Sequence, residues 1–247
     1  MPNRFISGHS RTPSAGGGGG GALLFVAHYE NGAATTTYSS WNGLATVSTG
    51  TAAADRLIVA IVCGQRTQSV ARTLSSITLD GTPMTIHRQS SAGDASPSAN
   101  PSLCMGIASL LVPTGTTAAV TATFNSNCAG AHLTIYRLTG LVSNTPYATS
   151  ASSSNGSNPA TTLDIPGNGL LLAGYSGSAP GSGGSAPAAG TWSGVSTEDW
   201  DEGTEGSSTT FWGSSASQTG MSAEVARAIS VTNAATGHEI VIAGSWR

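Results

Sequence analysis

Short apolar or alternating runs recur along most of this 247-residue chain, separated by clusters of Gly, Asn, Asp, Ser and Pro. Runs of this length suit strands, and alternation of apolar with polar residues is the period of a half-buried strand. A chain this long can bury a sizeable core. The sequence therefore predicts an all-β fold, an antiparallel jelly-roll-like β-sandwich, with strands at 22–28, 44–48, 56–63, 75–79, 84–89, 103–112, 117–124, 131–138, 161–165, 169–175, 208–212, 223–231 and 238–246.

Local patterns refine this prediction. Residues 57–62 are apolar at every position and predict a central strand covered on both faces, whereas 117–124 and 133–136 alternate and predict half-buried strands. Asp80-Gly81 lies between two such runs and predicts a two-residue type I′ hairpin. A helix is conceivable over 221–230, but the β-branched residues that continue this stretch favour a strand.

The N-terminal 21 residues differ from the rest, because a polar start with two prolines leads into six consecutive glycines. Such a run behaves in isolation as a flexible tether and permits close backbone approach. The sequence predicts an extended anchoring arm over residues 1–21 and one β-sandwich domain over 22–247. A division near 150–158 is disfavoured, because neither half holds enough apolar strand to close a sandwich. The predicted partner-binding residues of the arm are Arg4, Phe5, Ile6, Gly16 and Gly21.

Charge is scarce, since 9% of the residues are charged, the formal net charge is −3, and all nine basic residues are Arg. A nucleic-acid-binding surface needs clustered Lys and Arg, so nucleic acid is not expected as a partner. Membrane insertion is not expected either, because no apolar run approaches the roughly 18 residues of a membrane helix. The polar first residues also do not resemble a signal peptide. A chain with so little solvated charge is predicted to work packed against neighbouring subunits. The lack of Lys fits such interfaces, where Arg is the better residue, and fits a GC-rich coding sequence equally well.

Five carboxylates lie within eight residues at 198–205. Oxygen-rich loops can bind Ca²⁺, although this spacing does not match an EF-hand loop. A solvated acidic loop is the favoured interpretation, with calcium at Glu198–Glu205 as a weak alternative and no other cofactor expected. Carboxylates beside tryptophans also occur in glycoside hydrolases, but that chemistry needs two carboxyl groups held across a cleft.

Other candidate sites are weak. Residues 174–178 resemble a nucleophile elbow at Ser176, but a Ser stands where the second Gly belongs and no helix pattern follows. The five His residues show no metal-ligand spacing and are predicted to be polar residues at strand edges. Cys63 and Cys104 are predicted to be buried, and Cys128 could be exposed in a turn. No catalytic residue and no metal ligand is predicted.

Tryptophans on loops suggest a binding surface. Trp192, Trp200 and Trp212 fall in or beside Gly, Ser and Thr-rich stretches. Such rings can stack on sugars, so these three are the predicted glycan-binding residues, while plugs at sandwich ends or subunit interfaces are the favoured alternative.

Five segments carry a resemblance to a known group of proteins: DRLIVAIV at 55–62, SITLDG at 76–81, LLVPTG at 110–115, AAVTATF at 118–124 and LTIYRLTGL at 133–141. Their succession resembles the β-sandwich (jelly-roll) proteins of tailed-bacteriophage virions, of the capsid decoration, head fibre and tail spike kind. The likeness covers about residues 55 to 175 and lies in the pattern of strands, with no signature residue.

The resemblance implies a structural or adhesive protein with no family active site. It implies a protein that decorates or projects from the particle, anchored by its arm to capsid or tail proteins. Its place would be the virion, assembled in the host cytoplasm, and phage fibres suggest a homo-oligomer, a trimer by analogy. Recognition of a host surface glycan is the alternative function, and a glycan or ester hydrolase the less favoured one. Head, neck and tail positions stay open.

Overall fold

The computed structural model describes residues 5–6, 21–31, 38–67, 70–94, 101–180, 190–205, 209–232 and 237–247. Every strand pairing among them is antiparallel, and none of these residues is helical. The described part of the chain accordingly offers no helix long and apolar enough to cross a bilayer. The predicted all-β class is confirmed.

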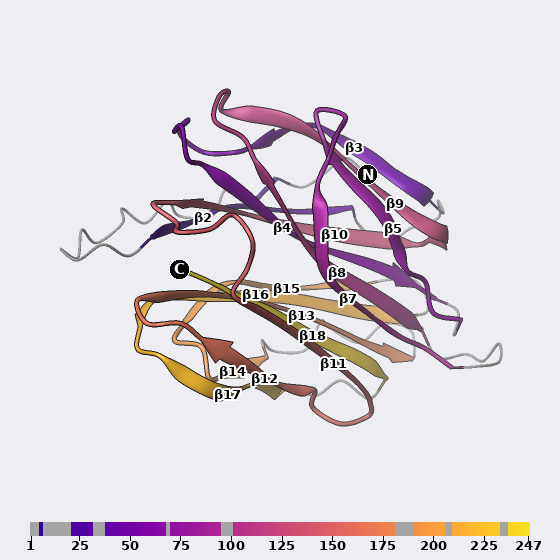
Figure 1. The fold of residues 1–247 in the computed structure, drawn as a ribbon. Coiled ribbons are helices and arrows are strands. Elements are labelled where there is room, and N and C mark those ends of the chain that lie inside the picture. The colour runs from indigo at the N-terminus through magenta and orange to yellow at the C-terminus, as the bar shows by residue number, and fades with distance from the viewer. Residues whose placement is uncertain are drawn as a thin grey trace.

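The first half of the chain forms two sheets (Figure 1). Sheet A has the order β1-β2-β10-β4-β8-β7, and sheet B the order β3-β9-β5-β6. The strands are β1 (Phe5–Ile6), β2 (Ala22–Asn31), β3 (Tyr38–Ser48), β4 (Leu57–Arg66), β5 (Leu74–Leu79), β6 (Thr82–Pro83), β7 (Thr85–Ala92), β8 (Ser102–Leu111), β9 (Thr117–Cys128) and β10 (Gly130–Thr139).

The second half forms two more sheets. Sheet C has the order β11-β18-β13-β16-β15, and sheet D the order β12-β17-β14. The strands are β11 (Ala148–Asn155), β12 (Ala160–Ile165), β13 (Gly169–Pro180), β14 (Thr191–Ser193), β15 (Thr197–Glu205), β16 (Thr209–Met221), β17 (Glu224–Thr232) and β18 (His238–Trp246).

The two halves repeat one topology. Without the short β1 and β6, the described residues of each half form eight strands. The first, eighth, third, sixth and fifth of them lie side by side in one sheet. The second, seventh and fourth form the other sheet. This is the strand order of a jelly roll in which the fifth strand joins the sixth. The chain is thus a jelly-roll β-sandwich, as predicted, built as two consecutive jelly rolls.

The three largest hydrophobic cores among the described residues lie between four sheets stacked in the order B, A, C, D. The first core lies between sheets A and B, with Ile58 and Val120 among its residues, and the third lies between C and D, with Leu171 and Ile229. The second core joins the halves, because it contains residues of both A and C. The expectation that neither half holds enough apolar strand to close a sandwich is wrong. The predicted boundaries at 1–21 and 22–247 remain a prediction.

Several local predictions are confirmed. The whole of β4 is buried or nearly so and lies between β10 and β8. β9 alternates buried positions with partly or fully exposed ones along 117–124. Asp80 and Gly81 have φ angles of 48° and 76° and join β5 to β6, as a type I′ turn requires. Residues 224–232 form β17 and not a helix.

Other predictions are wrong. The acidic segment 198–205, expected to be a loop, lies in the edge strand β15 of sheet C, and the stretch near 150–158 that was weighed as a division of the chain begins within the opposite edge strand β11. β10 was expected to be half-buried, yet both of its faces are covered, because sheets B and C pack on opposite sides of sheet A. Cys128 is 1% exposed, and all three cysteines are buried free thiols.

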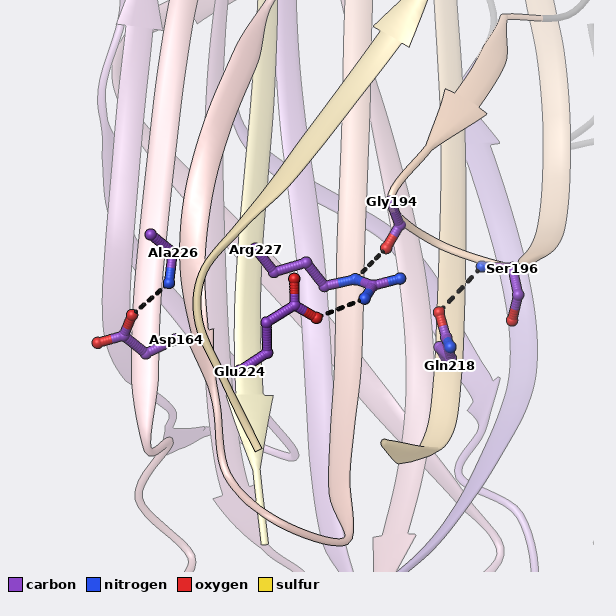
Figure 2. A network of polar contacts seen from close by, with 7 residues as sticks. All are labelled: Asp164, Gly194, Ser196, Gln218, Glu224, Ala226 and Arg227. Atoms are coloured by element: carbon purple, nitrogen blue, oxygen red, sulfur yellow. Dashed lines mark hydrogen bonds and ion pairs between the residues drawn. The ribbon is translucent and has the colours of Figure 1, made fainter. Parts of the chain in front are cut away.

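Polar contacts fasten sheet D to sheet C at one end of the molecule (Figure 2). The guanidinium of Arg227 in β17 donates to the Gly194 carbonyl at 2.6 Å and pairs with Glu224 at 2.7 Å. Beside it, the Ser196 amide donates to the Gln218 side chain at 3.2 Å. The turn between β14 and β15 is therefore held from two sides.

Candidate functional site

Trp192 lies in strand β14 and not in a loop as expected, and Trp212 lies in β16, within the stretch 208–212 that was predicted to be a strand. They share a small cluster with Tyr175 and Val231. Trp212 is 4% exposed, whereas Trp192 is half-buried and donates from Nε1 to the Ser214 hydroxyl at 2.7 Å. These two rings are brought together.

Trp200 lies apart from them, in β15, and contacts sheet A. Its ring stacks on His28 of β2 with ring centroids 3.4 Å apart. Nε1 donates to the Thr134 hydroxyl of β10 at 2.8 Å. The structure thus divides the three predicted glycan-binding tryptophans between two places, and glycan binding by them stays a prediction.

The acidic segment is an edge strand. Glu198 is exposed and accepts a hydrogen bond from Ser214 at 3.2 Å. Burial, and then the neighbouring Glu198, raise the pKa of Asp201 to about 7. Because two carboxyl groups this close do not both ionise easily, the pair holds a proton near neutral pH.

The described residues contain no group of three or more His, Cys, Asp or Glu arranged to hold a metal ion. Of the five carboxylates in the acidic segment, only that of Glu205 lies outside the described part. Calcium at Glu198–Glu205 stays a prediction.

Two tyrosines carry buried carboxylate contacts. Tyr136 is 0% exposed, and its hydroxyl lies 2.8 Å from both Asp199 and Ser215, joining β10 to sheet C. Tyr175 donates to Glu239 at 2.8 Å. Burial, followed by the adjacent carboxylate, raises the pKa of each tyrosine. Both hydroxyls therefore stay protonated and act as donors that fix the sheets.

Ser176 lies inside β13 and is fully buried. Its hydroxyl donates to the Trp212 carbonyl at 3.1 Å and accepts from Gln65 at 3.4 Å. A nucleophile elbow needs a strand, a sharp turn and a helix, and Ser176 lies in the middle of a strand instead.

A small cavity lies between sheets A and C. Its volume is about 10 Å³. It is lined by Ile61, Cys63, Met105, His132, Thr134, Tyr175, Trp200, Gly213 and Ser214. A space of this size holds at most about one water molecule. It is too small for a sugar ring.

The arm residues are placed only in part. Phe5 and Ile6 form β1, which pairs with Tyr29 and His28 of β2 at the edge of sheet A. Gly21 lies so close to Leu141 that an added Cβ would be 2.7 Å from its Cδ2 atom. Arg4 and Gly16 lie outside the described residues.

The prediction that the histidines are polar residues at strand edges is wrong for three of the five, whereas His87 is partly exposed in the edge strand β7 and His9 lies outside the described residues. His28, His132 and His238 are at most 4% exposed. The signal was available in part, since His28 and His132 each lie in a run that is otherwise mostly apolar. What the sequence could not supply was the ring that stacks on His28, because Trp200 comes from the other half of the chain.

No family model and no curated protein matches this chain. Among solved structures, it is similar to a chain of "Crystal structure of Cucumber Necrosis Virus", at 8% identity and a TM-score of 0.25, covering 100% of this chain and 94% of that one. It is also similar to a chain of "Cucumber Leaf Spot Virus", at 12% identity and a TM-score of 0.20, covering 100% and 93%. Scores this low carry no inference about function, so the fold assignment rests on the strand order above.

Proposed function

We propose that this chain is a non-enzymatic structural protein of a virus particle, of the tailed-bacteriophage kind, which decorates or projects from the capsid or tail. The observation that carries the proposal is the pairing of β1 with β2 at the edge of sheet A. An extended segment that adds a strand to a sheet edge can make the same hydrogen bonds to a neighbouring subunit. The arm would anchor the chain in this way to capsid or tail proteins and to further copies of itself, a trimer by analogy.

The body of the chain supports the same proposal. Two stacked jelly rolls present a rigid all-β body with few charges, and many buried polar side chains are engaged in contacts between its own strands. Such a body suits a building block of a particle assembled in the host cytoplasm. No cofactor is included in the proposal.

Ile6→Pro tests the anchor. Proline has no backbone N–H and is poorly tolerated in a paired strand, so we expect at least a tenfold loss of the chain from purified particles. Quantitative mass spectrometry of particles assembled with the variant measures this loss. Ser10→Pro, outside β1, is the control and should be incorporated normally. Equal incorporation of both variants would contradict the anchoring role.

Glycan recognition is the second candidate function. Trp192 is half-buried beside Ser214, which in turn donates to the exposed Glu198. An aromatic ring beside hydrogen-bonding oxygens is the usual composition of a sugar site.

A glycan array tests this candidate. Binding that Trp192→Ala abolishes, and that the buried Trp212→Phe retains, is the expected result. A silent array for the unmodified chain, or undiminished binding by Trp192→Ala, would remove the candidate.

A further inference from the structure

The interface between sheets A and C changes character along its length. At one end it is apolar, where Leu57 pairs with Leu138 in sheet A and Leu170 pairs with Trp246 in sheet C. At the other end the same strands carry polar groups that are all buried: Gln65, His132, Ser176, Ser178 and His238. The two jelly rolls are therefore joined by an apolar end and a polar end.

Three stacked rings occupy the edge of the polar end. His28 of β2 lies 3.4 Å from Trp200 of β15 and 5.6 Å from His132 of β10, measured between ring centroids. His28 is 3% exposed, and neither of its ring nitrogens has a hydrogen-bond partner among the described residues. Trp200 is the only ring of the three that belongs to the second half, so the stack is a contact between the halves.

Among the described side chains, the titratable groups around His28 offer it no free counter-charge; Glu30, which pairs with His132 in the sheet register, has its side chain outside the described residues. β10 contributes His132 and the Tyr136 hydroxyl, and β4 contributes the thiol of Cys63, which lies opposite His132 in the sheet register. On β15, the Asp199 carboxylate accepts the Tyr136 hydrogen bond.

The other charged groups at the polar end of the interface lie on or near β15 and β18. Glu202 follows Trp200 by two residues and is partly exposed, while Glu198 contacts Ser214 and raises the pKa of Asp201. On β18, His238 pairs with Asp94 at 3.2 Å.

We propose that the polar end of this interface is an acid-operated latch: protonation of His28 and His132 separates β2 and β10 from β15, while the apolar end keeps the two jelly rolls joined. A protonated imidazole in this place is a buried charge beside a second one, which is costly unless it is paired. Opening lets water reach both rings. The four named residues of the apolar end carry no titratable group, so we expect their contacts to persist as the pH falls.

The direction of the pH dependence follows from the two imidazoles. Burial, and then the nearby His132, hold the pKa of His28 well below 6.5, and burial lowers the pKa of His132 to about 4. A group whose pKa is lower in the closed state than in the open state stabilises the closed state above about pH 6.5. That stabilisation is lost as the pH falls toward about 4. From these pKa values, the titration of His132 alone raises the equilibrium constant for opening about 25-fold between about pH 7.5 and about pH 5. The titration of His28 raises it further.

The cysteines of the chain provide the measurement. Cys63 lies in the core between sheets A and C, whereas Cys104 and Cys128 lie in the core between A and B. All three are at most 3% exposed. Labelling of the unmodified chain with 4,4′-dithiodipyridine, mapped by mass spectrometry, reports each thiol separately. Each rate is divided by the rate of the urea-unfolded chain at the same pH, which removes the intrinsic pH dependence of the thiol.

We define the protection of a thiol as its labelling rate in the unfolded chain divided by its rate in the folded chain. The protection of Cys63 is expected to fall about 25-fold or more between about pH 7.5 and about pH 5, whereas the protection of Cys104 and Cys128 stays unchanged. In the double variant His28→Phe, His132→Gln, the protection of Cys63 should fall less than about threefold over the same pH range. The single variants His28→Gln and His132→Gln should each remove part of the fall, which keeps the test open if the double variant does not fold. The control variant is His87→Gln, which changes a histidine of β7 that is hydrogen-bonded to Ser109 of β8; it should keep the full loss of Cys63 protection.

Three outcomes would overturn the latch. Protection of Cys63 could be independent of pH, or all three cysteines could lose protection together, which is global unfolding. The full fall could also persist without both histidines. The latch does not depend on the virion role, because its measurement uses the isolated chain.

Discussion

Replacing Arg56 with alanine is expected to lower the free energy of unfolding by about 3–5 kcal/mol. Arg56 is 0% exposed, and its guanidinium donates to four backbone carbonyls: Val112 at 2.6 Å, Thr49 at 3.2 Å, Gly50 at 2.7 Å and Thr114 at 2.6 Å. These carbonyls belong to the loops after β3 and β8, so one side chain closes that end of the first jelly roll. Alanine leaves them without their donors and also leaves a cavity.

Urea denaturation followed by far-ultraviolet circular dichroism measures this loss. Arg137→Ala is the control, because Arg137 is partly exposed and its Nε donates to a single carbonyl, that of Thr51, at 2.8 Å. We expect this change to cost less than about 1 kcal/mol. Arg56→Lys should recover under half of the loss, since an ammonium cannot reach four acceptors in the fork geometry of a guanidinium. Equal costs for Arg56→Ala and Arg137→Ala would contradict the role of Arg56.

Gly194→Ala is expected to cost about 3 kcal/mol of stability. Gly194 has a φ of +84°, and a Cβ placed there would lie 1.9 Å from the Ala228 carbonyl oxygen. Relief of this clash requires the turn to move away from β17, which also lengthens the hydrogen bond from Arg227 to the Gly194 carbonyl (Figure 2). The substitution thus loosens sheet D from sheet C.

The control for this substitution is Gly220→Ala. Gly220 also has a positive φ, +65°, but a Cβ there would meet nothing within 4 Å. The Gly220→Ala variant therefore measures the cost of the positive φ alone, which we expect to be about 1 kcal/mol of stability. Thermal unfolding by calorimetry compares the two variants. The interpretation of Gly194 is wrong if both lower the melting temperature by the same amount.

Strands with a strong apolar signal were predictable. Residues 57–62 are apolar throughout, and such a run is stable only when both faces are covered, which is how β4 lies in sheet A. The turn at Asp80-Gly81 was predictable for a local reason, because few residues other than Asn, Asp and Gly adopt the positive φ angles it requires.

Strands without an apolar signal were not predictable. β11 consists mostly of Ser, Ala and Thr, and β15 carries five carboxylates. Both are strands because β18 and β16 offer them continuous partners at the two edges of sheet C. Edge strands can be polar, because one side of the backbone and much of their surface face solvent.

The candidate site was predictable only as residue types. Trp200 was recognised as an aromatic residue with a role, and its position in an acidic segment suggested a loop. Its stacking on His28 joins residues 172 positions apart in the chain. No local sequence pattern predicts a contact between residues so far apart in the chain. The hydrogen bond from Tyr136 to Asp199 was unpredictable for the same reason.

The sequence by itself determined that the chain is an antiparallel β-sandwich, because short alternating and apolar runs between turn residues can bury their apolar faces only as paired strands. The tertiary structure decided that the sandwich occurs twice, with matching strand orders, and that the two copies meet through sheets A and C. It also decided which charges and imidazoles are buried. The physical reason is that strand alternation is set by neighbouring residues, whereas sheet order and burial depend on contacts between distant segments that compete for the same apolar faces.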